Sequence, residues 1–266
     1  MTAYIKLYCK IIAKEFHRLL TYRSNLYSGI LSGFFMLAVR WALWAALFAT
    51  GNADGSSLRE TMTYFIVGDI AYNFIVVRYG NSIGSDIQSG DIATRLIKPF
   101  PYHLQLVSMA NAMASFSTLT YSLPLFIAAA FLIGLLPPIS AAAFGFFLLT
   151  TVLAGVIYNL IELLISYSAF WLTDYWHLSW FRGALFTLFG GGALPLWFYP
   201  EWLHTICGYL PFKYAVYQPM AVYLGRVPVD EIGTSLLMQL FWIAVLFAAE
   251  RFVWHRAQSK MAVQGG

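Results

Sequence analysis

The chain is poor in charged residues. Only 11% of its 266 residues are Asp, Glu, Lys or Arg, whereas about a quarter is usual in soluble domains. Hydrophobic residues make up 60%, and the mean hydropathy is +0.67. These values exclude an ordinary soluble enzyme and a disordered protein, and they indicate a protein that crosses a membrane several times.

Cysteine is also scarce. The chain has two, Cys9 before the first apolar stretch and Cys207 in a late loop. Two cysteines cannot build a disulfide-stapled domain, and on opposite sides of a membrane they cannot pair. We interpret both as ordinary small apolar residues.

Motifs for enzymatic chemistry are missing too. The sequence contains no phosphate-binding G-x-x-x-x-G-K-[ST], no H-E-x-x-H and no Cys/His cluster with zinc spacing. We therefore expect no catalytic residue, metal or cofactor in this chain. An intramembrane lipid-modifying enzyme is a remote alternative, since only His103 or His177 could serve it as a base.

Apolar stretches are abundant, and six are long enough to be considered membrane crossings, each of which needs about 20 residues. The expected fold class is an all-α polytopic membrane protein. The third stretch is longer than one crossing needs and contains Pro124, which predicts a kink. The fifth is interrupted by Gly190-Gly191-Gly192 and Pro195. The six are Leu26–Ala49, Thr61–Tyr79, about Leu104–Leu136, Ala141–Phe170, Trp180–Trp197 and Ile232–Ala249.

The basic residues predict the orientation. With six crossings, twelve of the sixteen Lys and Arg residues fall on the side of the two termini, so the positive-inside rule places both termini in the cytoplasm. We expect a multi-pass protein of a bacterial cell (inner) membrane. Its parts are residues 1–24, a six-span domain over 25–252 and a cytoplasmic tail over 253–266.

The first 24 residues read as a basic amphipathic helix. Basic residues recur every four positions, at Lys6, Lys10, Lys14 and Arg18, with apolar residues on another face. Such a helix is expected to lie along the anionic cytoplasmic surface of the membrane, in contact with lipid.

Three charged residues lie inside predicted spans, where charges are costly and often functional. Arg40 and Asp69 both fall about 12 Å below the outer surface at 1.5 Å per residue. They could form a structural ion pair, serve a transport pathway or extend separately toward water. Glu162 lies in the inner half of the fourth span and could face a partner subunit, line a cavity or pair with Arg182.

Two connecting regions carry further information. Residues 81–99 have helix-start residues, an apolar side and a stop at Pro99, which predicts a short cytoplasmic helix that must bury one face. Residues 195–231 are apolar but broken by prolines, which predicts short re-entrant helices on the outer side.

Together these regions resemble the permease subunit of an ABC-2 type exporter, in its branch of small six-span permeases. Ser89–Pro99 matches the pattern S-G-x-[IL]-x-x-x-L-[IL]-[KR]-P after the second span. Gly192–Gly225 contains the F-Y-P-x-W-L, L-P-F and Y-Q-P elements expected before the last span. The resemblance covers nearly the whole chain.

The resemblance implies a partner and a set of roles. Such permeases pair with a second permease, identical or related, and with cytoplasmic ATPase subunits that hold ATP and Mg²⁺; nucleic acid is not a partner. The loop after the second span acts as a coupling helix, the basic N-terminal helix helps to hold the ATPase, and substrate leaves at the dimer interface beneath the outer helices. The implied ATPase contacts are Ser85, Asp86, Ile87, Ser89, Gly90, Asp91, Arg95 and Leu96, and the implied outer gate is Trp202, Tyr209, Phe212 and Lys213.

A different class of transporter remains open from the residues alone. A proton-coupled secondary transporter or a channel could use Arg40, Asp69 and Glu162. The absence of an inverted repeat speaks against it. The substrate cannot be read from the sequence.

Overall fold

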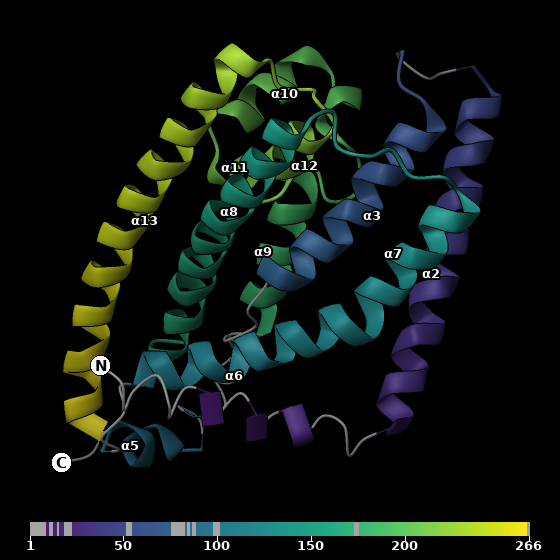
Figure 1. Ribbon diagram of the computed structural model, residues 1–266. Helices are drawn as coiled ribbons and strands as arrows, with labels where there is room; N and C mark the ends of the chain where they lie inside the picture. Colours follow the sequence, from purple (N-terminus) through teal and green to yellow (C-terminus); the bar gives the residue numbers. More distant parts are fainter. Residues whose placement is uncertain are drawn as a thin grey trace.

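The computed structural model describes residues 9–10, 13–14, 16–18, 23–51, 55–75, 83, 86, 89–97, 102–172 and 176–264. All regular structure in these ranges is helical, so the all-α prediction is confirmed for the described part of the chain (Figure 1). The α-helices are α2 (Arg23–Ala49), α3 (Leu58–Ile75), α5 (Asp91–Leu96), α6 (Tyr102–Ser117), α7 (Leu123–Leu132), α8 (Ala141–Tyr167), α9 (Trp176–Phe189), α10 (Glu201–Gly208), α11 (Pro211–Ala215), α12 (Tyr217–Tyr223) and α13 (Val229–Gln264).

Four of the described helical segments are long and apolar enough to cross a membrane. They match the first, third, fourth and sixth predicted spans. The last of them belongs to a helix that continues to Gln264, so the predicted tail is largely helical. The four segments are Tyr27–Ala49, Ser108–Ile133, Ala141–Phe170 and Val229–Ala257.

Helix α3, the second predicted span, is not among these four apolar segments. It carries three charged residues, which lower its hydropathy. Its segment Thr61–Val67 is nevertheless fully buried. Each of its charges has a partner within the protein: Arg59 bonds to the Gly134 carbonyl, Glu60 to Arg226, and Asp69 to Arg40. A helix enclosed by other helices can carry polar groups because the protein satisfies them.

Helix α9 corrects the fifth predicted span. It has 14 residues, or about 21 Å at 1.5 Å per residue, and it ends at Phe189 instead of continuing to Trp197. Gly191 has a φ of 77°, a conformation that glycine adopts without steric cost. The amides of Gly192 and Ala193 bond to the Thr187 carbonyl. The glycine run is therefore a helix end.

The third predicted span bends where the sequence suggested. Helix α6 passes into a π-helical turn, Thr118–Ser122, and then into α7. Pro124 at the start of α7 has no amide hydrogen for the preceding turn, and the Leu123 amide bonds five residues back, to the Thr118 carbonyl. Such π-turns are a recognised cause of kinks. The predicted kink thus has a defined structural form.

Helix α8 lies at the centre of the bundle, with α3, α9, α11, α12 and α13 packed around it. Ser140 caps its start by accepting a hydrogen bond from the Ala143 amide at 3.0 Å. The fully buried Gln239 of α13 donates to the carbonyls of Thr150 (3.1 Å) and Tyr214 (3.0 Å). These two bonds join α13 to α8 and α11.

The two ends of the bundle differ. At one end, called the α10 end here, α10, α11 and α12 are short helices, of which α10 follows Pro200 and α11 begins with Pro211. Helix α12 is buried throughout. At the opposite end, the α5 end, α5 lies near the last turns of α13 and the described pieces of residues 9–18 (Figure 1).

Candidate functional site

The 83–97 element consists here of Ile83, Asp86 and residues 89–97, and it lies at the α5 end of the molecule (Figure 1). Helix α5 begins after Gly90, whose φ of 76° forms the turn that leads into it. The Ser89 hydroxyl donates to the Asp91 carboxylate at 2.9 Å. Ser89, Gly90 and Asp91 are all exposed. The element therefore presents a small polar tip at this end.

The buried Asp86 carboxylate joins Arg95, within the same element, to Tyr102 of α6. Asp86 is only 4% exposed. Its Oδ1 lies 3.1 Å from Arg95 Nη2, and its Oδ2 accepts a hydrogen bond from the Tyr102 hydroxyl at 2.9 Å. Burial and the nearby Asp86 charge raise the pKa of Tyr102 well above its usual value, which keeps the hydroxyl protonated as a donor. The carboxylate is thus held from two sides.

A small apolar core extends the connection from the element to α8 and α13. Ile83, which is fully buried, packs in one cluster with Tyr102, Tyr167 and Ala257. Tyr167, at the end of α8, donates a hydrogen bond to the buried Glu250 of α13 at 2.9 Å. The element is therefore fixed to the same end of three helices.

The predicted ATPase contacts separate into two groups. Ser89, Gly90 and Asp91 are exposed, whereas Asp86 points into the protein and Arg95, which is half-buried, pairs with it. Leu96 ends α5. Ser85 and Ile87 lie outside the described residues.

Arg40 and Asp69 form an ion pair, which is the first of the three alternatives given for them in the sequence analysis. Arg40 Nη1 lies 2.8 Å from Asp69 Oδ2, and the guanidinium stands over the Phe65 ring at 4.9 Å. The side chains remain 27% and 39% exposed. The pair therefore joins α2 to α3 and still offers unused donor and acceptor positions.

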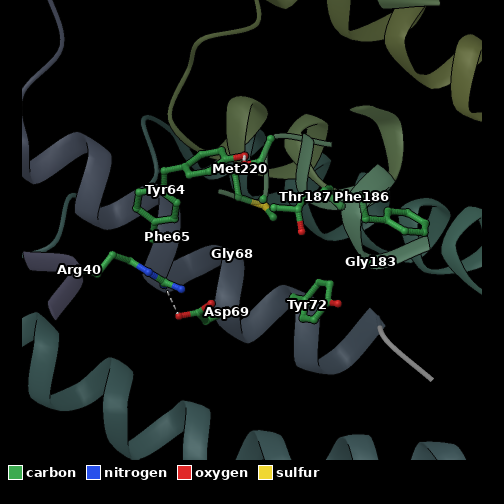
Figure 2. Close-up of a pocket in the computed structure, with 13 residues that line it drawn as sticks. Arg40, Tyr64, Phe65, Gly68, Asp69, Tyr72, Gly183, Phe186, Thr187 and Met220 are labelled. Atoms are coloured by element: carbon green, nitrogen blue, oxygen red, sulfur yellow. Dashed lines mark hydrogen bonds and ion pairs between the residues drawn. The ribbon is translucent and has the colours of Figure 1, made fainter. Parts of the chain in front are cut away.

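This pair forms one wall of a cavity of about 250 Å³. Figure 2 shows residues of α3 along one side and Gly183 and Phe186 of α9 toward the other. The remaining walls come from the glycine turn that ends α9 and from Val216 and Met220. Arg40 and Asp69 are its only charged lining residues in the described part of the chain.

Glu162 is likewise paired. Its carboxylate contacts Arg182 of α9, and the two side chains are 2% and 15% exposed. Of the three alternatives given for Glu162, the structure shows the pairing with Arg182. Since both Asp69 and Glu162 are engaged by arginine, the structure offers less support for a proton carrier built from these carboxylates.

The four predicted gate residues have different surroundings at the α10 end. Trp202 and Tyr209 are strongly exposed, as expected of aromatic residues at a membrane interface. Phe212 packs edge-on against Phe186, with ring centroids 5.1 Å apart. Burial lowers the pKa of the neighbouring Lys213. Among the ring contacts of the described residues, Phe212 alone of the four packs against a residue that lines the cavity described above.

The basic N-terminal segment is described in pieces. Lys10, Lys14 and Arg18 are exposed, while Phe16, on the predicted apolar face, packs edge-on against Phe116 of α6 at 5.2 Å. The exposed basic residues and the packed Phe16 agree with the predicted basic and apolar faces of this segment. Lys6 lies outside the described residues.

Several important residues escaped the sequence analysis. Glu250 directly follows the predicted sixth span and was not singled out, and Tyr102 and Tyr167 carry no charge that would mark them as candidates. Asp86, three residues after Ile83, has the spacing of a shared helical face, which was a usable signal. Among the described residues, no group of three or more His, Cys, Asp or Glu could hold a metal ion.

Comparison with known proteins identifies the family. A family model described as ABC-2 family transporter protein matches residues 13–265, so nearly all of the described helices lie within the match. No match was found among the curated proteins compared with the chain. The match also covers the 83–97 element, the cavity and the short helices of the α10 end. The chain belongs to the ABC-2 transporter family.

Proposed function

We propose that this protein is the membrane-spanning subunit of an ATP-driven exporter and that ATP hydrolysis takes place on a separate chain. Membership of the ABC-2 transporter family supports this most directly. In this proposal α3 and α9 complete six crossings, α3 with its segment Thr61–Val67 buried among neighbouring helices and α9 with most of its described residues exposed. Both termini then lie in the cytoplasm of a bacterial cell, and ATP and Mg²⁺ stay with the ATPase.

The ATPase docks on the exposed tip of the 83–97 element. Ser89, Gly90 and Asp91 supply contacts that a partner can reach, with Ser85, Ile87 and Leu96 as further predicted contacts. Asp86 and Arg95 serve instead as positioning residues, because their ion pair holds the element together and Asp86 also accepts a hydrogen bond from Tyr102 of α6. Lys10, Lys14 and Arg18 help to hold the ATPase beside the membrane surface, where basic residues also attract anionic lipid.

A second permease, identical or related, completes the export path. Substrate passes outward along the interface of the two permeases, beneath the short helices of the α10 end. Phe212 is the gate residue best supported by its contacts, since it packs against the α9 residues Phe186 and Phe189. Lys213 flanks it. Trp202 and Tyr209 are more exposed and could anchor the gate helices at the interface as well as close it.

The docking proposal predicts a large effect of one charge reversal. Asp91→Arg is expected to weaken binding of the ATPase subunit by about tenfold or more, because it reverses a charge at the contact. The chain should still fold, since Asp91 is exposed and, among the described residues, its carboxylate is bonded only by the Ser89 hydroxyl. The measurement is the affinity of the purified, co-expressed ATPase for the full chain in nanodiscs.

A matched control is available at the other end of the molecule. Asp230 is also exposed and also lies in the first turn of a helix, α13. Asp230→Arg should leave ATPase affinity unchanged. Equal affinity for the Asp91→Arg and wild-type chains would show that the tip is not the docking site.

A further inference from the structure

We propose that the cavity between α3, α9 and α12 binds an uncharged, hydroxyl-bearing group of an amphiphilic substrate. This inference rests on the proposed function, because a substrate site presupposes a transporter. It is argued from the volume, the charges and the walls of the cavity, each of which restricts the ligand in a different way.

The volume restricts the ligand to a small group. The cavity measures about 250 Å³, below the roughly 300–1,000 Å³ of sites that enclose a whole drug-sized molecule. It can enclose one ring or a compact headgroup, while the rest of a larger molecule stays outside.

The charges favour a group without net charge. Arg40 and Asp69 cancel each other across 2.8 Å, and the other lining residues carry no formal charge. An anion bound to Arg40 would face the Asp69 carboxylate, and a cation bound to Asp69 would face the guanidinium. Hydroxyl groups can instead donate to Asp69 and accept from Arg40 without breaking the pair. The partial exposure of both side chains leaves such positions open.

The walls favour a group with apolar faces. Tyr64, Phe65, Tyr72 and Phe186 line the cavity, and rings of this kind pack well against the C–H faces of a polyol. The Tyr64 hydroxyl already donates to the Gly191 carbonyl at 2.8 Å, so Tyr64 contributes mainly its ring. Thr187 adds one more hydroxyl to the lining.

The surroundings indicate an amphiphile. Arg40 lies well inside the apolar segment Tyr27–Ala49, and its neighbours Met36, Val39 and Trp41 are exposed apolar residues. A polar group that reaches Arg40 at this depth can do so while its apolar tail lies along α2, because the tail then replaces lipid there.

Binding of octyl amphiphiles with different headgroups tests this inference. The probes are octyl glucoside, octyl sulfate, octyltrimethylammonium and octylphosphocholine, each added below micelle formation to the full chain in nanodiscs. Tryptophan emission can report binding, since Trp197 packs against Tyr64 and Trp44 against Phe65, with ring centroids 5.1 and 5.7 Å apart. Octyl glucoside is expected to bind at least tenfold more tightly than each of the others. Equal or tighter binding of octylphosphocholine would overturn the hydroxyl assignment.

Filling the cavity is the matched structural test. A Cβ at Gly183, which lines the cavity, meets no atom within 4 Å, so Gly183→Leu can extend into the space without a backbone clash. It should weaken octyl glucoside binding at least tenfold. Gly145 of α8 has the same free space but does not line the cavity, and Gly145→Leu should bind like wild type. Unchanged binding by Gly183→Leu would remove the cavity as the site.

Single-charge variants test the role of the ion pair. Asp69→Asn leaves Arg40 as the only charge, so preference should shift at least tenfold toward octyl sulfate. Arg40→Gln should shift it toward octyltrimethylammonium. An unaltered order of probes in both variants would refute the charge argument. All of these measurements use the permease alone, so a failure of ATPase docking at Asp91 leaves them unaffected, and the two proposals can fail separately.

Discussion

Asp86→Ala is expected to release the 83–97 element from α6 and to reduce amide protection in α5 roughly a hundredfold. The substitution leaves the half-buried Arg95 without its 3.1 Å partner and removes the acceptor of the Tyr102 hydroxyl. Removing one member of a buried pair costs about 3–5 kcal/mol. The lower end applies because Arg95 is 26% exposed, and about 3 kcal/mol corresponds to roughly a hundredfold. Hydrogen exchange of the full chain, followed on peptides that contain Asp91–Leu96, measures it.

Three further variants separate the ion pair from other contributions. Asp91→Asn changes an exposed carboxylate in the same element and should alter protection by no more than about threefold. Tyr102→Phe removes one hydrogen bond and should cost about 1 kcal/mol. Arg95→Met added to Asp86→Ala should recover part of the loss, because no unpaired guanidinium remains. If Asp86→Ala exchanges no faster than Asp91→Asn, the pair does not hold the element.

The sequence predicted the crossings that depend on a helix meeting lipid. Helices α2 and α13 contain long apolar segments that the rest of the protein buries very little, so their hydropathy reports their surroundings directly. Helix α3 is different, because its neighbours in the bundle surround Thr61–Val67 and partner its charges. Its position in the membrane depends on contacts with residues that are distant in the sequence. A hydropathy profile averaged over neighbouring residues does not include those contacts.

The end of α9 shows a second limit. Gly190–Gly192 was expected to interrupt a span that continued to Trp197. A glycine run permits both a flexible helix and a helix end. The helix end found here packs against the Phe212 carbonyl, which stands 3.1 Å from where a Cβ of Gly190 would lie, and against the Tyr64 hydroxyl, which donates to the Gly191 carbonyl. Neither neighbour is close to the turn in the sequence.

The site was predictable in position but not in detail. Equal depth on adjacent antiparallel spans was enough to suggest the Arg40–Asp69 pair. The loop of residues 81–99 was found from its caps and its apolar side, yet Asp86 was grouped with the contact residues. Its inward direction depends on Arg95 and Tyr102, nine and sixteen positions later. The cavity could not be predicted, because its lining comes from α2, α3, α9, α12 and the segments between them.

Glu162→Ala is expected to destabilise the chain by about 3–5 kcal/mol. Glu162 is 2% exposed, and its removal leaves the Arg182 guanidinium, 15% exposed, without its anionic partner between α8 and α9. A charge left in such surroundings has neither water nor a counter-ion. For a chain of this size, where 1 kcal/mol shifts the melting temperature by about 2–4 °C, the midpoint should fall by roughly 10 °C. Thermal unfolding of the full chain in detergent micelles measures it.

The double variant decides whether the charge or the side-chain volume matters. Glu162→Met combined with Arg182→Met removes both charges and keeps apolar volume, and replacing both members of a buried pair is often nearly neutral. It should therefore melt within a few degrees of wild type, whereas either single substitution should not. Glu201→Ala, at an exposed position in the first turn of α10, controls for loss of a carboxylate as such. A double variant as unstable as Glu162→Ala would mean that the packing of these side chains, and not their charge pairing, holds α9 to α8.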